Sequence, residues 1–262
     1  MHSVVNVGLF LPDMTYLEKL RHRIAVTGSG LCVGLDIRLE KADDAARAFI
    51  ADVITQTAPY TAVYKPNSAY FEALGWEGMK LLEETIAMIP KDIPVILDAK
   101  RGDIGETQRY YAKACFDILG ADAVTLNPYM GRDTLEPFLD YLDKGIYLLG
   151  VTSNPGAVDI ELQTLQGGGQ VFELVGKMTA QHPQAGLVLG LTNATPETLA
   201  RIPDVPLLIP GLGAQGGDIA ALHGAARTAP CVVNVSRGIL YAEPELTFAQ
   251  KAEKWARVIA GN

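Results

Sequence analysis

Short apolar segments rich in β-branched residues recur along the whole chain, and this recurrence limits the fold more than any other feature. Several segments are nearly continuous in Val, Ile and Leu, which is typical of strands buried on both faces. The pattern predicts eight strands, at residues 31–36, 62–67, 94–98, 122–126, 146–152, 187–192, 206–210 and 231–235.

Segments with helical periodicity lie between these strands. We expect helices at residues 42–57, 69–89, 105–119, 134–142, 171–181, 196–201, 218–228 and 246–259. Eight strands that alternate with eight helices favour a (β/α)8 TIM barrel, with a doubly wound open sheet as the alternative. One further helix at 16–27 precedes the first strand. We therefore expect one domain over residues 1–262, with an N-terminal extension at 1–30 and the barrel at 31–262.

Length, charge and cysteine content narrow the class of protein. A chain of 262 residues suits a single α/β barrel. Its net charge of −8 disfavours binding to nucleic acid or to an anionic membrane. No apolar run approaches the ~18 residues of a membrane span. Cys32, Cys115 and Cys231 have no CxxC spacing, so we expect neither a zinc site nor disulfides, and a cytoplasmic location.

Charged residues gather where the predicted strands end, which is where barrel enzymes place their active sites. Asp36 ends the first strand, Lys65 lies near the end of the second, and Asp98 and Lys100 end the third. We expect Lys65, Asp98 and Lys100 to form an alternating array in which Lys100 remains a cation. A buried ion-pair network without a catalytic role is the alternative. Asp103 either joins the array or caps the helix that follows it.

A glycine-rich stretch follows the seventh strand. Residues 211–216 match the pattern G-x-G-x-x-G, but they lie far from the first strand–helix unit in which that pattern binds dinucleotides. A phosphate cradle built with the eighth loop is the better interpretation, with Gln215 and Arg237 as side-chain donors. A purely structural turn is the alternative. The long connection at 153–170 is expected to act as a lid.

The stretch from Asp98 to Gly105, D-A-K-R-G-D-I-G, resembles the D-x-K-x-x-D signature of the orotidine 5′-phosphate decarboxylase family. Further stretches occur in the order that this family shows, namely 34–36, 65–67, 152–156, 210–218 and 236–237. Residues 65–72 and 152–156 are similar to its longer, bacterial-type subgroup. The resemblance implies cofactor-free and metal-free conversion of orotidine 5′-monophosphate to UMP and CO2, the last step of de novo UMP synthesis.

The resemblance also implies residue roles. Lys100 is the implied proton donor, Asp98 lies beside the substrate carboxylate, and Lys65 holds Asp98 and a ribose hydroxyl. Asp103 and Thr107 are implied to enter the site of a partner subunit in a homodimer. The implied substrate-binding residues are Asp36, Thr107, Ser153, Pro210, Gln215, Gly216, Ser236 and Arg237.

Two other functions remain open on the sequence. One is a magnesium-dependent 3-keto-sugar-phosphate decarboxylase or aldolase on the same barrel, which metal dependence would identify. The other is a barrel that only binds a phosphorylated metabolite. The charged array, and Lys100 above all, disfavours a simple binder, because burying charges is costly unless they have a use.

Overall fold

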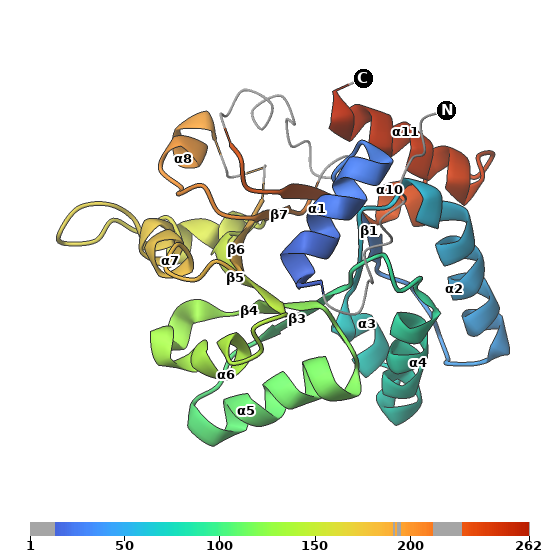
Figure 1. The fold of residues 1–262 in the computed structure, drawn as a ribbon, viewed down its shortest axis with the longest axis horizontal. Coiled ribbons are helices and arrows are strands. Elements are labelled where there is room, and N and C mark those ends of the chain that lie inside the picture. The colour runs from blue at the N-terminus through green and yellow to red at the C-terminus, as the bar shows by residue number, and fades with distance from the viewer. Residues whose placement is uncertain (1–13, 191, 193–194, 212–226, 262) are drawn as a thin grey trace, which may run out of the picture.

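The strands of the computed structural model, which describes residues 14–190, 192, 195–211 and 227–261, form one parallel sheet (Figure 1). All eight predicted strands are present, with ends shifted by at most a few residues. They are β1 (Leu31–Leu35), β2 (Val63–Pro66), β3 (Ile96–Arg101), β4 (Ala123–Leu126), β5 (Gly145–Val151), β6 (Ala185–Leu189), β7 (Leu207–Ile209) and β8 (Cys231–Val235).

The sheet closes on itself. Its order is β2-β1-β8-β7-β6-β5-β4-β3, so β2 and β3 are its two ends. Two parallel bridges, Tyr64 with Val95 and Asn67 with Asp98, join these ends. The predicted (β/α)8 barrel is therefore confirmed, and the open doubly wound sheet is wrong.

Helices surround the barrel and mostly follow the sequence prediction. They are α1 (Tyr16–Thr27), α2 (Asp44–Thr57), α3 (Ser68–Glu72), α4 (Gly75–Met88), α5 (Gly105–Lys113), α6 (Glu136–Leu139), α7 (Val171–Thr179), α8 (Pro196–Ala200), α10 (Arg237–Leu240) and α11 (Phe248–Ala260). Short 3-10 turns are η2 (Ala58–Tyr60), η4 (Pro128–Met130), η5 (Arg132–Thr134) and η6 (Pro155–Asp159), and η3 (Ala114–Ile118) is a π-helical turn. The helix expected at 218–228 lies almost entirely outside the described residues.

Two of the expected helices differ from the structure. The helix expected at 69–89 is two helices, because Gly75, the first residue of α4, adopts a φ of +70°. The helix expected at 134–142 is reduced to the single turn of α6, in which Pro137 stands at the start.

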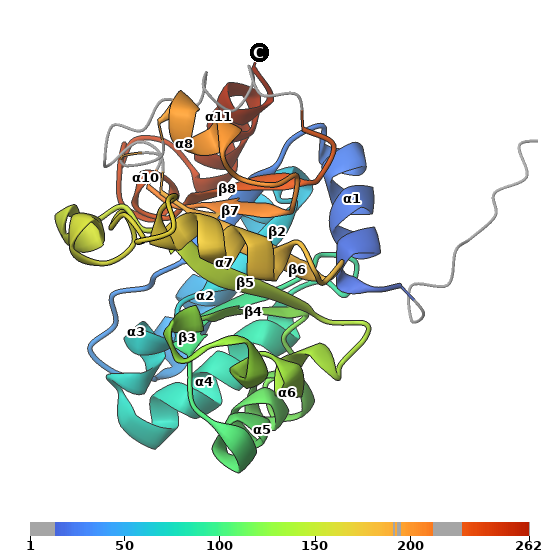
Figure 2. The same cartoon turned by 90° about the vertical axis from the view of Figure 1, so that its left-hand side faces the viewer.

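Helix α1 covers the end of the barrel at which the strands begin (Figure 2). Thr15 and Glu18 form a capping box at its start, and Gly28 ends it in the left-handed region. Tyr16 packs edge-on against Tyr147 inside the barrel, and their hydroxyl oxygens lie 2.8 Å apart. The interior of the barrel is therefore filled with side chains at this end.

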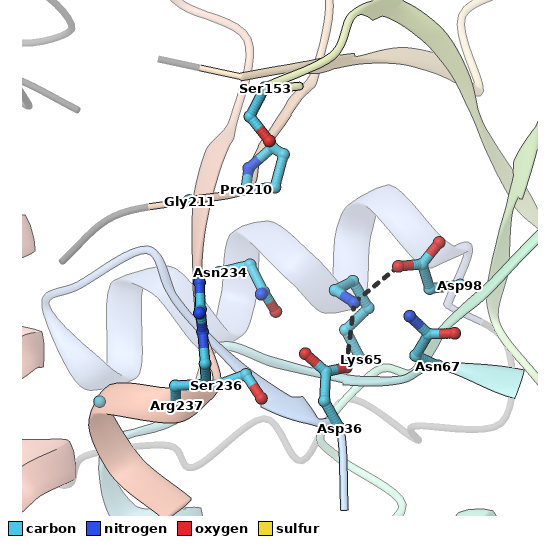
Figure 3. Close-up of a pocket in the computed structure, with 11 residues that line it drawn as sticks. Asp36, Lys65, Asn67, Asp98, Ser153, Pro210, Gly211, Asn234, Ser236 and Arg237 are labelled. Atoms are coloured by element: carbon cyan, nitrogen blue, oxygen red, sulfur yellow. Dashed lines mark hydrogen bonds and ion pairs between the residues drawn. The ribbon is translucent and has the colours of Figure 1, made fainter. Parts of the chain in front are cut away.

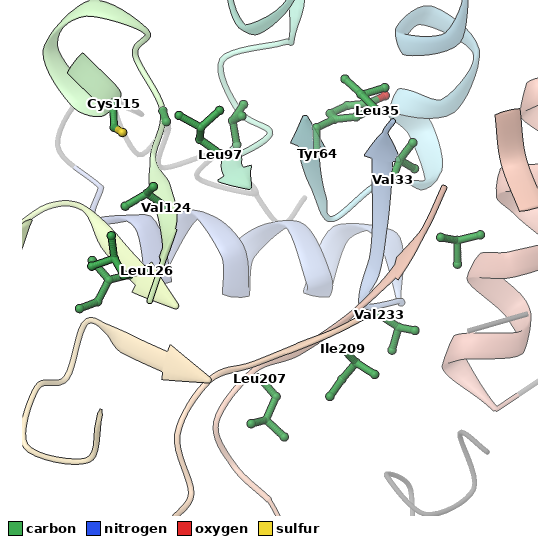
Figure 4. Close-up of a cluster of buried hydrophobic side chains, with 14 of the residues drawn as sticks. Val33, Leu35, Tyr64, Leu97, Cys115, Val124, Leu126, Leu207, Ile209 and Val233 are labelled. Carbon is green, nitrogen blue, oxygen red and sulfur yellow. The ribbon is translucent and has the colours of Figure 1, made fainter. Parts of the chain in front are cut away.

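The main core lies between the strands and the surrounding helices (Figure 4). Side chains alternate along each strand, so Val33 and Leu35 face the helices while Cys32 joins the smaller cluster inside the barrel. Burial raises the pKa of the Cys32 thiol to about 12, as expected for a core cysteine. None of the helices in the described ranges combines the length and the apolar character that crossing a membrane requires.

Candidate active site

The carboxyl ends of the strands bring four charged side chains together, as the sequence predicts. Asp36 follows β1, Lys65 lies on β2, and Asp98 and Lys100 lie on β3. Figure 3 shows Lys65 between Asp36 and Asp98, with its ammonium directed toward both carboxylates. The Lys65 Nζ lies 2.8 Å from Asp98 Oδ2 and 3.9 Å from Asp36 Oδ1, and Lys100 Nζ lies 2.5 Å from Asp98 Oδ1.

Mutual attraction keeps Lys65 and Asp98 ionised although both side chains are largely buried. Burial opposes a charge on Lys65, but the carboxylates of Asp98 and Asp36 outweigh it and raise the pKa of this lysine above its ordinary value. Burial likewise opposes ionisation of Asp98, and the ammonium groups of Lys65 and Lys100 hold its pKa well below its usual range. The site therefore presents a fixed anion between two cations. Only Lys100 has a substantially exposed side chain, at 48%.

Strand β3 is irregular at the array, which the sequence did not predict. A regular strand would place Asp98 and Lys100 on the same face, but the β3–β4 register shifts between Leu97 and Arg101. Lys100 adopts a φ of +48°, a left-handed conformation that is costly for a residue with a side chain. The hydroxyl of Thr125 on β4 contacts this irregular segment. Thr125 was not among the predicted site residues, because its position in the middle of an apolar strand gave no signal.

A cavity of about 170 Å³ opens beside the array. Its lining residues are Asp36, Lys65, Asn67, Asp98, Ser153, Pro210, Gly211, Asn234, Ser236, Arg237 and Gly238. Sequence reasoning missed Asn67 and Asn234. Both could have been found by strand alternation, because Asn67 is two residues beyond Lys65 and Asn234 is two residues before Ser236.

A second cavity of about 250 Å³ adjoins the first. Lys65, Asp98, Ser153 and Pro210 line both cavities. Lys100 and Thr125 line only the second, together with the apolar side chains of Leu149, Val188 and Leu208. Asp98 therefore lies where the two cavities meet, and Lys100 lines the largely apolar one.

Several polar groups in the first cavity are available to a ligand. Asp36 Oδ1 and Ser236 Oγ are buried, and neither finds a hydrogen-bond partner among the described residues. The exposed guanidinium of Arg237 lines the same cavity and forms no ion pair with the described part of the chain. Buried oxygens without partners and an unpaired cation suit a polar, anionic molecule.

The connection at 153–170 begins at the cavities. Ser153 lines both of them, and η6 follows it directly. The carboxylate of Glu161 accepts a bond from the backbone N–H of Thr152 at 2.7 Å and from its hydroxyl at 2.8 Å. Glu161 therefore ties the middle of this connection to the end of β5, next to Ser153.

Two predicted site residues do not join the array. Asp103 forms no ion pair within the described ranges, so it does not join the array of its own chain. Its expected capping role is wrong, because Ile104 is the N-cap of α5 and no side chain caps that helix. Asp103 accepts a bond only from the N–H of Ile104 among its described contacts. Thr107 is exposed on α5.

Four more predicted substrate-binding residues divide into two pairs. Gln215 and Gly216 lie outside the described residues, whereas Pro210 and Ser236 line the first cavity. No group of three or more His, Cys, Asp or Glu side chains with the spacing of a metal site occurs among the residues that the structure describes.

Comparison with known proteins places this site in a family. A model of the orotidine 5′-phosphate decarboxylase/HUMPS family matches residues 29–252. A protein of Herpetosiphon aurantiacus named orotidine 5′-phosphate decarboxylase is 44% identical, over 92% of this chain and 95% of that protein. A protein of the same name from Dehalococcoides mccartyi is 42% identical, over 93% of this chain and 95% of that protein. The solved structure of Leishmania donovani OMP decarboxylase is 37% identical, with a TM-score of 0.85, and covers 95% of this chain and 98% of its own.

Proposed function

The chain belongs to the orotidine 5′-phosphate decarboxylase/HUMPS family, and on this premise we propose that it decarboxylates orotidine 5′-monophosphate to UMP and CO2. This reaction is the last step of de novo UMP synthesis. The observation that carries the proposal is the array in which Asp98 contacts both Lys65 and Lys100 at the strand ends, beside a cavity.

The chemistry explains why such an array is needed. Loss of CO2 leaves an electron pair on an sp2 carbon, C6 of the pyrimidine, which the ring cannot easily delocalise. A cation that already stands at this carbon in a poorly hydrated site stabilises the developing charge. The Lys100 ammonium fills this role and then donates its proton to C6. When substrate fills the site, the apolar side chains of the second cavity limit the water around this ammonium.

The other members of the array hold Lys100 and the sugar. Asp98 lies beside the substrate carboxylate and orients Lys100, and Lys65 holds Asp98 and a ribose hydroxyl. Asp36 binds the ribose, and its buried Oδ1, which has no hydrogen-bond partner among the described residues, supports this role. Each of these groups contacts the substrate or the residue that does.

The phosphate supplies binding energy at a distance from the reacting carbon. Arg237 and Gln215 bind it, and Ser153 contacts the pyrimidine. Pro210, Gly216 and Ser236 complete the substrate-binding site. The guanidinium of Arg237, which lines the first cavity and has no ion-pair partner among the described residues, supports this assignment. Binding energy from a remote phosphate can be used to close the 153–170 connection and order the array.

A magnesium-dependent reaction on a sugar phosphate remains the second candidate, because the family description covers more than one activity. The experiment that separates the two is a spectrophotometric assay of orotidine 5′-monophosphate loss, with and without EDTA. We expect the same rate in both. Activity that EDTA abolishes and magnesium restores would favour the second candidate.

The site is proposed to be completed by a second copy of the chain in a homodimer. Asp103 and Thr107 do not reach the array in the described structure, and we assign them to the partner's site. Exposed apolar side chains on the side of the barrel that carries α5 support such an interface. They are Ile104 and Tyr110, on or next to α5, and Tyr129 and Met130 of η4.

Mixing two inactive variants tests the shared site. Lys100→Ala and Asp103→Ala proteins are dissociated, mixed and reassociated. If Asp103 acts in the partner's site, each hybrid dimer has one site with both defects and one with none. Random reassociation makes half of the dimers hybrid, so about a quarter of all sites regain activity. If no activity returns although hybrid dimers are shown to have formed, Asp103 does not act across the interface.

The three cysteines are free, which supports the reducing cytoplasm as the compartment in which this reaction takes place. The net charge of −8 supports small-molecule ligands rather than nucleic acid as binding partners.

A further inference from the structure

We propose that Thr125 is a positioning residue for the decarboxylation, which its hydroxyl assists by holding Asp98 and the backbone of Lys100 in place. This inference rests on the proposed function. Thr125 lies on β4, is 1% exposed and lines the second cavity beside Lys100. It stands next to the array but belongs to none of the ion pairs in it.

The Thr125 hydroxyl uses its full hydrogen-bonding capacity at this one place. It donates to Asp98 Oδ1 at 3.0 Å. It accepts from the backbone N–H of Ala99 at 3.1 Å and from that of Lys100 at 2.9 Å. A hydroxyl has one proton and two lone pairs, so these three contacts leave nothing for another group.

These contacts replace the strand ladder that β3 loses at this point. Leu97 pairs with Val124, and the next pair in the register is Arg101 with Leu126. Four steps along β3 therefore oppose two steps along β4, and the N–H groups within the bulge lack the carbonyl partners of a regular sheet. The Thr125 hydroxyl occupies this gap and satisfies two of them, which buried N–H groups require.

The bulge is also where the backbone is strained. Lys100 adopts a φ of +48°, which a residue with a Cβ atom adopts only if its surroundings impose it. The bond from the Lys100 N–H to Thr125 is one of the contacts that fix this conformation. The same hydroxyl orients the carboxylate oxygen that receives the Lys100 ammonium. Thr125 thus fixes both ends of the Lys100 side chain.

A misplaced ammonium should reduce the chemical step more than substrate binding. A shift of about 1 Å at a reacting group can lower a rate by ~10²-fold. The phosphate and ribose ligands lie on other strands and keep their positions. We therefore expect Thr125→Val, which keeps the shape of the side chain and removes the hydroxyl, to lower kcat at least 10-fold with KM within 3-fold of the wild type.

Two further variants separate positioning from a general loss of structure. Thr125→Ser restores the hydroxyl and should return kcat to within 3-fold of the wild type. Thr85→Val is the matched control, because Thr85 is fully buried and its hydroxyl bonds only to the Leu81 carbonyl within α4 among its described contacts. It should leave kcat unchanged. Amide hydrogen exchange at Ala99 and Lys100 should be faster in Thr125→Val and unchanged in Thr85→Val.

The outcomes test the positioning role of Thr125 separately from the proposed decarboxylation. A kcat of Thr125→Val within 3-fold of the wild type, or a loss in Thr125→Ser as large as in Thr125→Val, overturns the positioning role. If Thr125→Val does not fold, Thr125→Cys against Thr125→Ser decides, because a thiol is a weak donor and should lower kcat at least 5-fold relative to serine. A wild-type chain that does not turn over orotidine 5′-monophosphate overturns the proposed function itself.

Discussion

Replacement of Asp98 by Asn should leave the buried ammonium of Lys65 without its nearest carboxylate. The Lys65 side chain is 4% exposed and that of Asp98 is 11% exposed, so water cannot replace the lost anion. Removing one partner of a buried ion pair costs ~3–5 kcal/mol of unfolding free energy. Asp36 remains 3.9 Å away and offsets part of the loss. We therefore expect a loss of about 3 kcal/mol at pH 7, the lower end of that range.

The pH dependence of this loss follows from the directions of the pKa shifts. In the wild type the pKa of Lys65 is raised, so its contribution is complete below the unfolded pKa of ~10.4 and disappears only at higher pH. In Asp98→Asn, burial without that carboxylate lowers the pKa of Lys65, so the variant gains stability as pH rises toward ~10. The difference in unfolding free energy between the wild type and Asp98→Asn should therefore be smaller at pH 9.5 than at pH 7.

A low pH should also reduce the difference in unfolding free energy between the wild type and Asp98→Asn. The pKa of Asp98 is lowered in the folded protein, so its contribution is present above the unfolded pKa of ~3.9 and is lost as pH falls below that value. Urea unfolding at fixed protein concentration, at pH 7, at pH 9.5 and at a pH below ~3.9, measures these effects. The control is Glu253→Gln, which removes an exposed ion pair with Arg257 and should cost less than ~1 kcal/mol. A loss below 1 kcal/mol in Asp98→Asn, with the same difference from the wild type at pH 7 and at pH 9.5, would refute the reasoning.

Three further substitutions test the assigned roles. Lys100→Ala should lower kcat at least ~10³-fold while UMP binding, measured by calorimetry, changes little, and near-normal turnover by the folded variant would contradict the proton-donor role. Lys100→Gly should be about 1 kcal/mol more stable than Lys100→Ala in urea, because glycine tolerates the φ of +48°; equal stabilities would show that no strain is stored there. Arg237→Ala should weaken binding of the phosphorylated substrate ~10–100-fold and binding of the bare nucleoside little, and equal losses for both ligands would assign Arg237 to the fold.

The part of the site that could be predicted from the sequence is the set of charged residues at the carboxyl ends of the strands. Parallel strands in a barrel have their carboxyl ends on one side, so charged residues at the ends of adjacent strands must lie close together. This rule predicted the contact of Lys65 with Asp98 across β2 and β3. The same rule, combined with the alternation of side chains along a strand, would also have placed Asn67 beside Lys65 and Asp98.

Helix boundaries were harder to predict, because periodicity extends across local breaks. Residues 69–89 keep a helical pattern, yet α3 and α4 are separate helices. The break follows from Gly75, whose φ of +70° no regular helix contains. Gly78 then lets α4 pack closely on α3, because a Cβ atom there would lie 2.0 Å from the Phe71 carbonyl oxygen. A lone glycine inside a helical pattern does not reveal which of these conformations it adopts.

The bulge in β3 could not be predicted, for a different reason. Its conformation depends on Thr125, which is 25 residues beyond Lys100 in sequence and on another strand. The residues around Lys100 favour a regular strand. The left-handed conformation of Lys100 costs roughly 1–2 kcal/mol relative to an extended one. The contacts that outweigh this cost are the two N–H bonds to Thr125 and the ion pair with Asp98. These contacts also fix the Lys100 ammonium, so the local pattern fails at the residue whose position matters most for the proposed chemistry.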